Sequence, residues 1–75
     1  MDKNDIIVKL GFHLRKLRKE RNLTQAQVAY LMGKDRQSYQ RIELGNTNPT
    51  LGYLLQVASA FNISFVELFS FLEKD

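Results

Sequence analysis

The chain of 75 residues has no cysteine and no tryptophan, and only one histidine and one proline. Without cysteine, neither a disulfide framework nor a thiolate metal site is available. The single histidine, His13, has no second histidine or carboxylate at a ligand spacing, so we expect no metal site. No catalytic cysteine, paired acids or glycine-rich phosphate loop is present, and we therefore expect neither an enzyme nor a cofactor.

Long apolar runs are missing as well. Near the start, charged residues surround an apolar run of only three residues, at positions 6–8, which argues against a signal peptide. No stretch approaches the roughly eighteen apolar residues of a membrane span. We therefore expect a cytoplasmic protein with no membrane partner.

The length of the chain limits the number of domains and the size of the core. A chain of 75 residues makes one small domain over residues 1–75, with 44% hydrophobic residues and thus a globular composition. Such a domain buries only about 60% of its unfolded surface and is marginally stable alone. Since disulfides are unavailable, we expect a core shared with a second copy to supplement it.

The net charge of +3 is unevenly distributed. Residues 9–41 carry nine Lys or Arg against two acids, whereas residues 42–75 carry four acids and one Lys. A basic N-terminal half suits a polyanion such as a nucleic acid. A solvated, merely soluble surface is the alternative explanation of the charge alone.

Two short helices joined by a tight turn are predicted for residues 24–44. Thr24 caps the first helix and has Gln27 three residues later, which is a capping box. Gly33 is suited to the left-handed conformation that ends this helix, and Asp35 is a cap for the next one. This arrangement is a helix-turn-helix.

The second of these helices has one face without any acid. Ser38, Tyr39 and Ile42 fall on the opposite, inward side of a helical projection. Paired donors and acceptors of Arg and Gln match the edges of guanine and adenine in the major groove. The candidate base-reading residues are Gln37 and Arg41 first, followed by Arg36 and Gln40.

Several spaced motifs resemble the Cro and phage-repressor (Xre-like) helix-turn-helix family over residues 10–69. They are Leu23-Thr24-Gln25, Ala29, Gly33, Ser38-Tyr39-Gln40-Arg41-Ile42-Glu43-x-Gly45 and Asn48-Pro49-Thr50-Leu51. The resemblance implies an all-α, five-helix, lambda-repressor-like fold. It also implies a sequence-specific regulator of transcription that binds double-stranded DNA, acts as a repressor and associates with the nucleoid when bound.

The resemblance assigns further roles. It implies an ion pair between Arg18 and Glu43 that ties the first helix to the second helix of the helix-turn-helix, the predicted recognition helix. It also favours a phosphate contact by Gln25, with Thr24 beside it, over the alternative of a solvated helix start.

This chain departs from the family pattern at two positions. Lys34 replaces a usually apolar residue, so we expect its stem to cover the core and its ammonium to point outward toward a phosphate. Tyr39 replaces a branched aliphatic residue and can pack there if its hydroxyl finds a partner.

The loop at residues 45–50 has the sequence GNTNPT. Asn46, Thr47 and Asn48 are candidate donors to DNA phosphates, and simple turn chemistry is an equally good explanation of them. The loop has no basic residue, so we expect it to make little minor-groove contact.

Three more helices complete the prediction. The first covers about residues 5–21, after a frayed start at residues 1–4. The fourth covers about residues 51–61, and its apolar residues are assigned to the core: Leu51, Leu54, Leu55, Val57, Ala58 and Phe61. Ser64 and Glu67 form a capping box that opens a fifth helix over about residues 64–73.

The fifth helix is too apolar for an ordinary surface element. We expect Val66, Phe69, Phe71 and Leu72 to face a second copy of the chain. The alternative is a wider single core that includes residues 6–8. A two-fold dimer sets two half-sites roughly 34 Å apart and so predicts a near-palindromic operator.

Two questions stay open at the level of sequence. A helical adaptor that binds protein through the fifth helix, without reading DNA sequence, is the rival function, and the acid-free face of the recognition helix argues against it. Phage Cro-like repressors, restriction-modification controllers and toxin-antitoxin regulators all suit a DNA-binding chain of this size. The sequence identifies no toxin or polymerase subunit as a partner.

Overall fold

The computed structural model describes residues 2–73, which form helices and no strand. The elements follow the predicted order, with the fifth one split in two. They are α1 (Lys3–Glu20), α2 (Gln25–Met32), α3 (Arg36–Leu44), α4 (Leu51–Phe61), α5 (Phe65–Leu68) and the 3-10 helix η1 (Ser70–Leu72). The predicted all-α fold is confirmed.

The start of α1 differs from the prediction. The helix begins at Lys3 because the Asp2 carboxylate accepts a hydrogen bond from the backbone N–H of Asp5 at 3.0 Å, which caps the first turn. The expected fraying is therefore wrong for residues 3–4, and Met1 lies outside the described residues.

The C-terminal segment also differs from the prediction. The Ser64–Glu67 capping box forms, yet α5 ends at Leu68 instead of continuing to residue 73. In a continuous helix Phe69 and Phe71 would point about 200° apart. The change to η1 instead brings their ring centroids to 6.0 Å, and both side chains pack against the core. Burial of two aromatic rings explains the break.

A single core unites all five α-helices. The largest fully buried side chains include one from each of them: Leu14, Val28, Tyr39, Val57 and Leu68. The prediction for α4 is wrong at two positions, because Leu51 and Leu55 are 64% and 50% exposed. The core takes only one face of α4.

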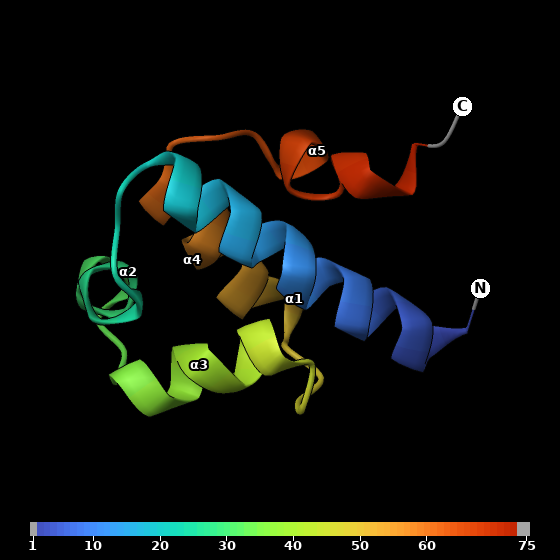
Figure 1. Ribbon diagram of the computed structural model, residues 1–75, viewed down its shortest axis with the longest axis horizontal. Helices are drawn as coiled ribbons and strands as arrows, with labels where there is room; N and C mark the ends of the chain where they lie inside the picture. Colours follow the sequence, from blue (N-terminus) through green and yellow to red (C-terminus); the bar gives the residue numbers. More distant parts are fainter. Residues whose placement is uncertain (1, 74–75) are drawn as a thin grey trace.

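The long helix α1 separates two parts of the molecule. Figure 1 shows α3 on one side of α1, and α5 with η1 on the other. The recognition helix and the C-terminal segment therefore belong to different faces. Among residues 2–73, no helix is long and apolar enough to cross a membrane.

Candidate nucleic-acid interface

The turn between α2 and α3 has the geometry predicted from its residues. Thr24 and Gln27 complete the capping box, with hydrogen bonds of 3.1 and 2.8 Å between each side chain and the other residue's backbone N–H. Gly33 adopts φ +68°, and nothing within 4 Å would meet a Cβ there, so only the backbone conformation calls for glycine. Asp35 then accepts from the Ser38 N–H at 3.3 Å and starts α3.

The two faces of α3 are separated as expected. Tyr39 and Ile42 are buried. The side chains that we predict to read bases lie on the other face, where Arg36, Gln37 and Arg41 are exposed and Gln40 is half-buried. Leu44, at the end of the same face, is also exposed. Contact of these residues with bases remains a prediction.

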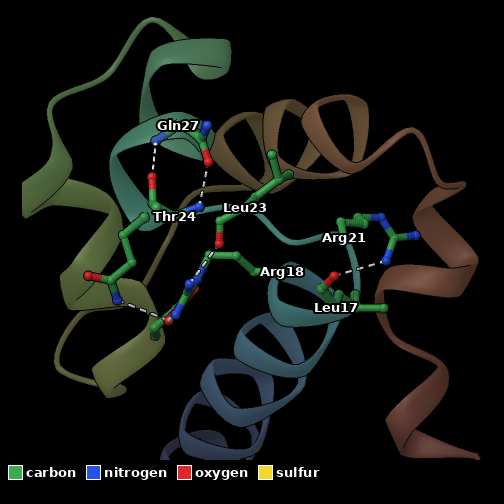
Figure 2. Close-up of polar contacts among 8 residues, drawn as sticks. Leu17, Arg18, Arg21, Leu23, Thr24 and Gln27 are labelled. Atoms are coloured by element: carbon green, nitrogen blue, oxygen red, sulfur yellow. Dashed lines mark hydrogen bonds and ion pairs between the residues drawn. The ribbon is translucent and has the colours of Figure 1, made fainter.

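A nearly buried ion pair anchors α3 to α1. Arg18 Nε and Nη2 donate to the two Glu43 carboxylate oxygens at 2.7 and 3.1 Å, a bidentate pair. Arg18 Nη1 also donates to the Leu23 carbonyl at 2.9 Å, so the same guanidinium holds the chain between α1 and α2, as Figure 2 shows. The side chains are only 12% and 3% exposed, which makes the pair structural.

The environment of Glu43 keeps both partners charged. Burial raises the pKa of Glu43, but the hydrogen bonds from Arg18 and Gln25, together with the nearby Tyr39 hydroxyl, outweigh that effect and leave the pKa below its usual value. The hydrogen bond to Glu43 in turn raises the pKa of Arg18. At neutral pH the pair is therefore fully ionised.

The Tyr39 hydroxyl departs from its prediction. The side chain is fully buried, and burial followed by the nearby Glu43 carboxylate raises the pKa of Tyr39. The hydroxyl lies close to that carboxylate, but no atom of residues 2–73 completes a hydrogen bond of good geometry with it. The hydroxyl is therefore an unmet donor near a negative charge.

Gln25 has a contact that the sequence did not reveal. Its amide donates to Glu43 Oε1 at 3.0 Å, so the side chain is held against α3 and is half-buried. The Thr24 hydroxyl is likewise engaged, since it accepts from Gln27. The amide nitrogen has a second N–H, and this is the donor that a phosphate contact by Gln25 would use while the bond to Glu43 stays in place.

A second polar cluster lies beside the start of α3. Ser38 Oγ and the Tyr53 hydroxyl are 3.1 Å apart and share a hydrogen bond between α3 and α4. The Lys34 ammonium lies 5.7 Å from the centre of the Tyr53 ring. The Lys34 side chain therefore extends over the Tyr53 ring. The sequence did not predict a role for Tyr53, because no local spacing relates α4 to the turn.

The polar side chains of the loop after α3 are wholly or partly exposed to solvent. Asn46 and Asn48 are exposed and Thr47 is half-buried. These residues line a shallow hollow together with Lys3 from the first turn of α1. The fold therefore brings a lysine to a loop that has no basic residue of its own.

Gly11 permits α1 to approach the end of α3. A Cβ at Gly11 would lie 2.3 Å from the Glu43 carbonyl oxygen and 2.9 Å from that of Ile42. This contact, together with the ion pair, fixes the position of α3. This close approach could not be predicted from the sequence, since a glycine inside a helix is not itself a packing signal.

The proposed dimer residues fall into two groups. Phe69 lies beside a hollow of about 350 Å³ that is also lined by Ile6 and Ile7, and Phe71 packs on His13 with ring centroids 5.2 Å apart. These contacts agree with the alternative of a wider core. Val66 and Leu72 remain 73% and 41% exposed.

His13 also departs from the expectation of a simple surface residue. Its Nε2 lies 3.3 Å from the Glu67 carbonyl oxygen, and the side chain is half-buried. Together with the Phe71 contact, this places His13 as a packing residue that holds the C-terminal segment against α1.

Comparison with known proteins identifies the family. Residues 14–68 match the helix-turn-helix family HTH_3. The chain belongs to this family. C.MunI, a control protein of Mycoplasma sp, is 40% identical over 73 residues, which are 96% of this chain and 99% of the relative. This HTH_3 protein is therefore a DNA-binding regulator of transcription.

Two solved structures agree with this assignment. The restriction-modification controller protein C.AhdI from Aeromonas hydrophila superposes with a TM-score of 0.87 at 38% identity, over 92% of this chain and all of that one. The wild-type restriction-modification controller C.Esp1396I gives a TM-score of 0.79 at 28% identity, over 93% and 96% of the two chains. The predicted Cro-type resemblance and fold are confirmed.

Proposed function

We propose that this HTH_3 protein is the controller of a restriction-modification system. The supporting observation is the similarity to the restriction-modification controller protein C.AhdI, which, like the similarity to the control protein C.MunI, runs over almost the whole of both chains. The outward face of α3 also supports this function, because it is largely exposed and contains no acid. Of the three contexts open to the sequence, this is the one for which the solved relatives C.AhdI and C.Esp1396I are named.

The protein reads its operator with α3 in the major groove. Gln37 and Arg41 contact base edges first, and Arg36 and Gln40 assist them, because their side chains match adenine and guanine edges. Phosphate contacts come from Thr24, Gln25 and Lys34 on one side and from residues 46–48 on the other. Repression follows where the operator overlaps a promoter.

A homodimer is the binding form. One recognition helix offers a few base contacts, each worth about 1–3 kcal/mol of discrimination, which is too little to find one site in a genome. Val66 and Leu72 supply exposed apolar surface for the partner copy. We expect two half-sites about 34 Å apart.

Selection from a random DNA pool at near-physiological salt tests the proposal. We expect an enriched, two-fold symmetric motif, and expect it to occur upstream of restriction-modification genes. An asymmetric motif would contradict the dimer. Salt-sensitive retention without any enriched motif would contradict sequence-specific binding and favour the adaptor function.

Substitution in α3 separates the roles of its residues. Gln37→Ala and Arg41→Ala should each relax the selected motif at one position per half-site, with about 1–3 kcal/mol less discrimination. Lys16→Ala is the matched control, since Lys16 is exposed on α1 rather than on α3. An unchanged motif for Gln37→Ala would remove Gln37 from the base-reading set.

A further inference from the structure

The cluster of Lys34, Ser38 and Tyr53 stands at the edge of the base-reading face. Ser38 and Arg41 are three residues apart on α3 and so are neighbours on the helix surface. Ser38 is half-buried, and so is Tyr53 on α4, which places their shared hydrogen bond between the core and the solvent. The hydroxyl pair therefore adjoins a residue that we expect to enter the major groove.

Neither hydroxyl exhausts its hydrogen-bonding capacity in this contact. Each hydroxyl has one donor and two acceptor positions, and the contact at 3.1 Å uses one position on each. When Ser38 donates to Tyr53, the Tyr53 proton is free to donate to an acceptor outside the protein. An anionic oxygen is the acceptor that gains most, because hydrogen bonds to charged groups are stronger than neutral ones.

Lys34 supplies the positive charge at the same place. Its ammonium lies 5.7 Å from the Tyr53 ring centre, and it makes no ion pair within residues 2–73. The nearest acid in sequence, Asp35, is engaged in capping the Ser38 N–H at 3.3 Å. A cation without a carboxylate partner beside a free hydroxyl donor is suited to one phosphate oxygen.

We propose that Lys34 and Tyr53 together bind one phosphate of the DNA backbone, with Ser38 orienting the Tyr53 hydroxyl toward it. This inference rests on the proposed function and deepens it, because it adds a residue of α4 to the contacts. The phosphate contact fixes the depth and angle at which α3 enters the groove. Tyr53 thereby acts on base reading through position and not by touching a base.

Three variants separate the parts of this site. Tyr53→Phe removes the hydroxyl and keeps the ring under Lys34, Ser38→Ala removes the orienting group, and Lys34→Met removes the charge and keeps the stem. Tyr30→Phe is the matched control for the first, since Tyr30 is 84% exposed on α2. Lys16→Met is the control for Lys34→Met.

Operator affinity at several salt concentrations gives the first measurement. We expect Tyr53→Phe to bind the selected operator about tenfold more weakly, with a melting temperature no lower than that of Ser38→Ala, which loses the same internal hydrogen bond. Lys34→Met should reduce the slope of log affinity against log salt by about one, whereas Tyr53→Phe should leave the slope unchanged. Ser38→Ala should lose less affinity than Tyr53→Phe, because the Tyr53 hydroxyl remains.

Operators in which one phosphate at a time is a neutral methylphosphonate give the second measurement. The parent protein should lose affinity at every contacted phosphate. At one of these phosphates per half-site Tyr53→Phe should lose clearly less affinity than the parent does, because the variant has no hydroxyl to contact it. Tyr53→Phe with parental affinity, or equal sensitivity of both proteins at every phosphate, would overturn the inference while the operator itself remains. A parent protein that selects no operator would overturn the proposed function, and the site with it.

Discussion

The helix-turn-helix and the C-terminal segment are built in opposite ways. Both α2 and α3 have side-chain caps at their starts and left-handed glycines at their ends, and a nearly buried ion pair fixes α3 to α1. The segment formed by α5 and η1 has only a four-residue helix, and it leaves Val66 and Leu72 exposed. One chain is sufficient to shape the DNA-reading part, whereas the C-terminal part retains apolar surface that a partner copy can cover.

Loss of the ion pair between Arg18 and Glu43 should lower the stability of the helix-turn-helix more than any other substitution. Arg18→Met leaves the Glu43 carboxylate buried without its cation, and we expect the free energy of unfolding to fall by about 3–5 kcal/mol. Urea denaturation measures this loss. Arg15→Met, exposed on the same helix, should change stability by less than about 0.5 kcal/mol. Equal melting of the Arg18 variant and the parent would show that α3 is held by other contacts.

Acid should weaken the same pair. The pKa of Glu43 is lower in the folded state than in the unfolded chain, where a glutamate titrates near about 4.3. Its contribution is therefore complete above that value and is lost as the pH falls through the folded pKa. Unfolding free energies of the parent and of Glu43→Gln, measured between neutral and acidic pH, should converge in acid. A constant difference would contradict the linkage.

Filling the close contact at Gly11 should have the next largest effect. The Cβ of Gly11→Ala would overlap the Glu43 carbonyl and force α1 away from α3, at a cost of about 1–3 kcal/mol. Gly52→Ala is the matched control, because the nearest atom to its added Cβ is 4.0 Å away and alanine favours a helix. We expect opposite shifts in melting temperature. A Gly11 variant as stable as the parent would mean that the helices can separate at little cost.

A smaller effect is expected from Tyr39→Phe. The hydroxyl lies near a carboxylate but completes no hydrogen bond, so its removal should change the unfolding free energy by less than about 1 kcal/mol in either direction. Thermal and urea unfolding measure the difference. A loss above about 2 kcal/mol would indicate that the hydroxyl bonds Glu43 in solution.

The smallest effect on folding, and the largest on assembly, should come from the C-terminal surface. Val66→Ser with Leu72→Ser removes exposed apolar groups, so the monomer fold should change by less than about 0.5 kcal/mol per site. The dimer dissociation constant measured by sedimentation should rise at least about tenfold, and operator binding should weaken as the dimer is lost. Leu31→Ser, also exposed but on α2, is the control. Unchanged assembly would contradict the proposed interface.

Local chemistry explains what the sequence predicted well. The caps at Thr24, Asp35 and Ser64 form as expected, because each depends on residues three positions apart. The two faces of α3 followed from helical periodicity in the same way. The partnership of Arg18 with Glu43 spans 25 positions and was accessible only through family resemblance.

Contacts between distant elements account for what was missed. The exposure of Leu51, the break after α5 and the tie between Gln25 and Glu43 depend on which helix packs against which, and periodicity within one element does not contain that information. Tyr53 was missed for the same reason, since its partners are on α3 and in the turn before it.

The hydrogen bond between Gln25 and Glu43 changes what a phosphate contact by Gln25 would contribute. One N–H of the amide already donates to Glu43 Oε1 at 3.0 Å, so the second N–H is the donor left for a DNA phosphate. Arg18 donates to both Glu43 oxygens and so fixes the carboxylate that holds the amide. Little side-chain order then has to be established on binding, and Gln25 serves as a donor that is in place before DNA arrives.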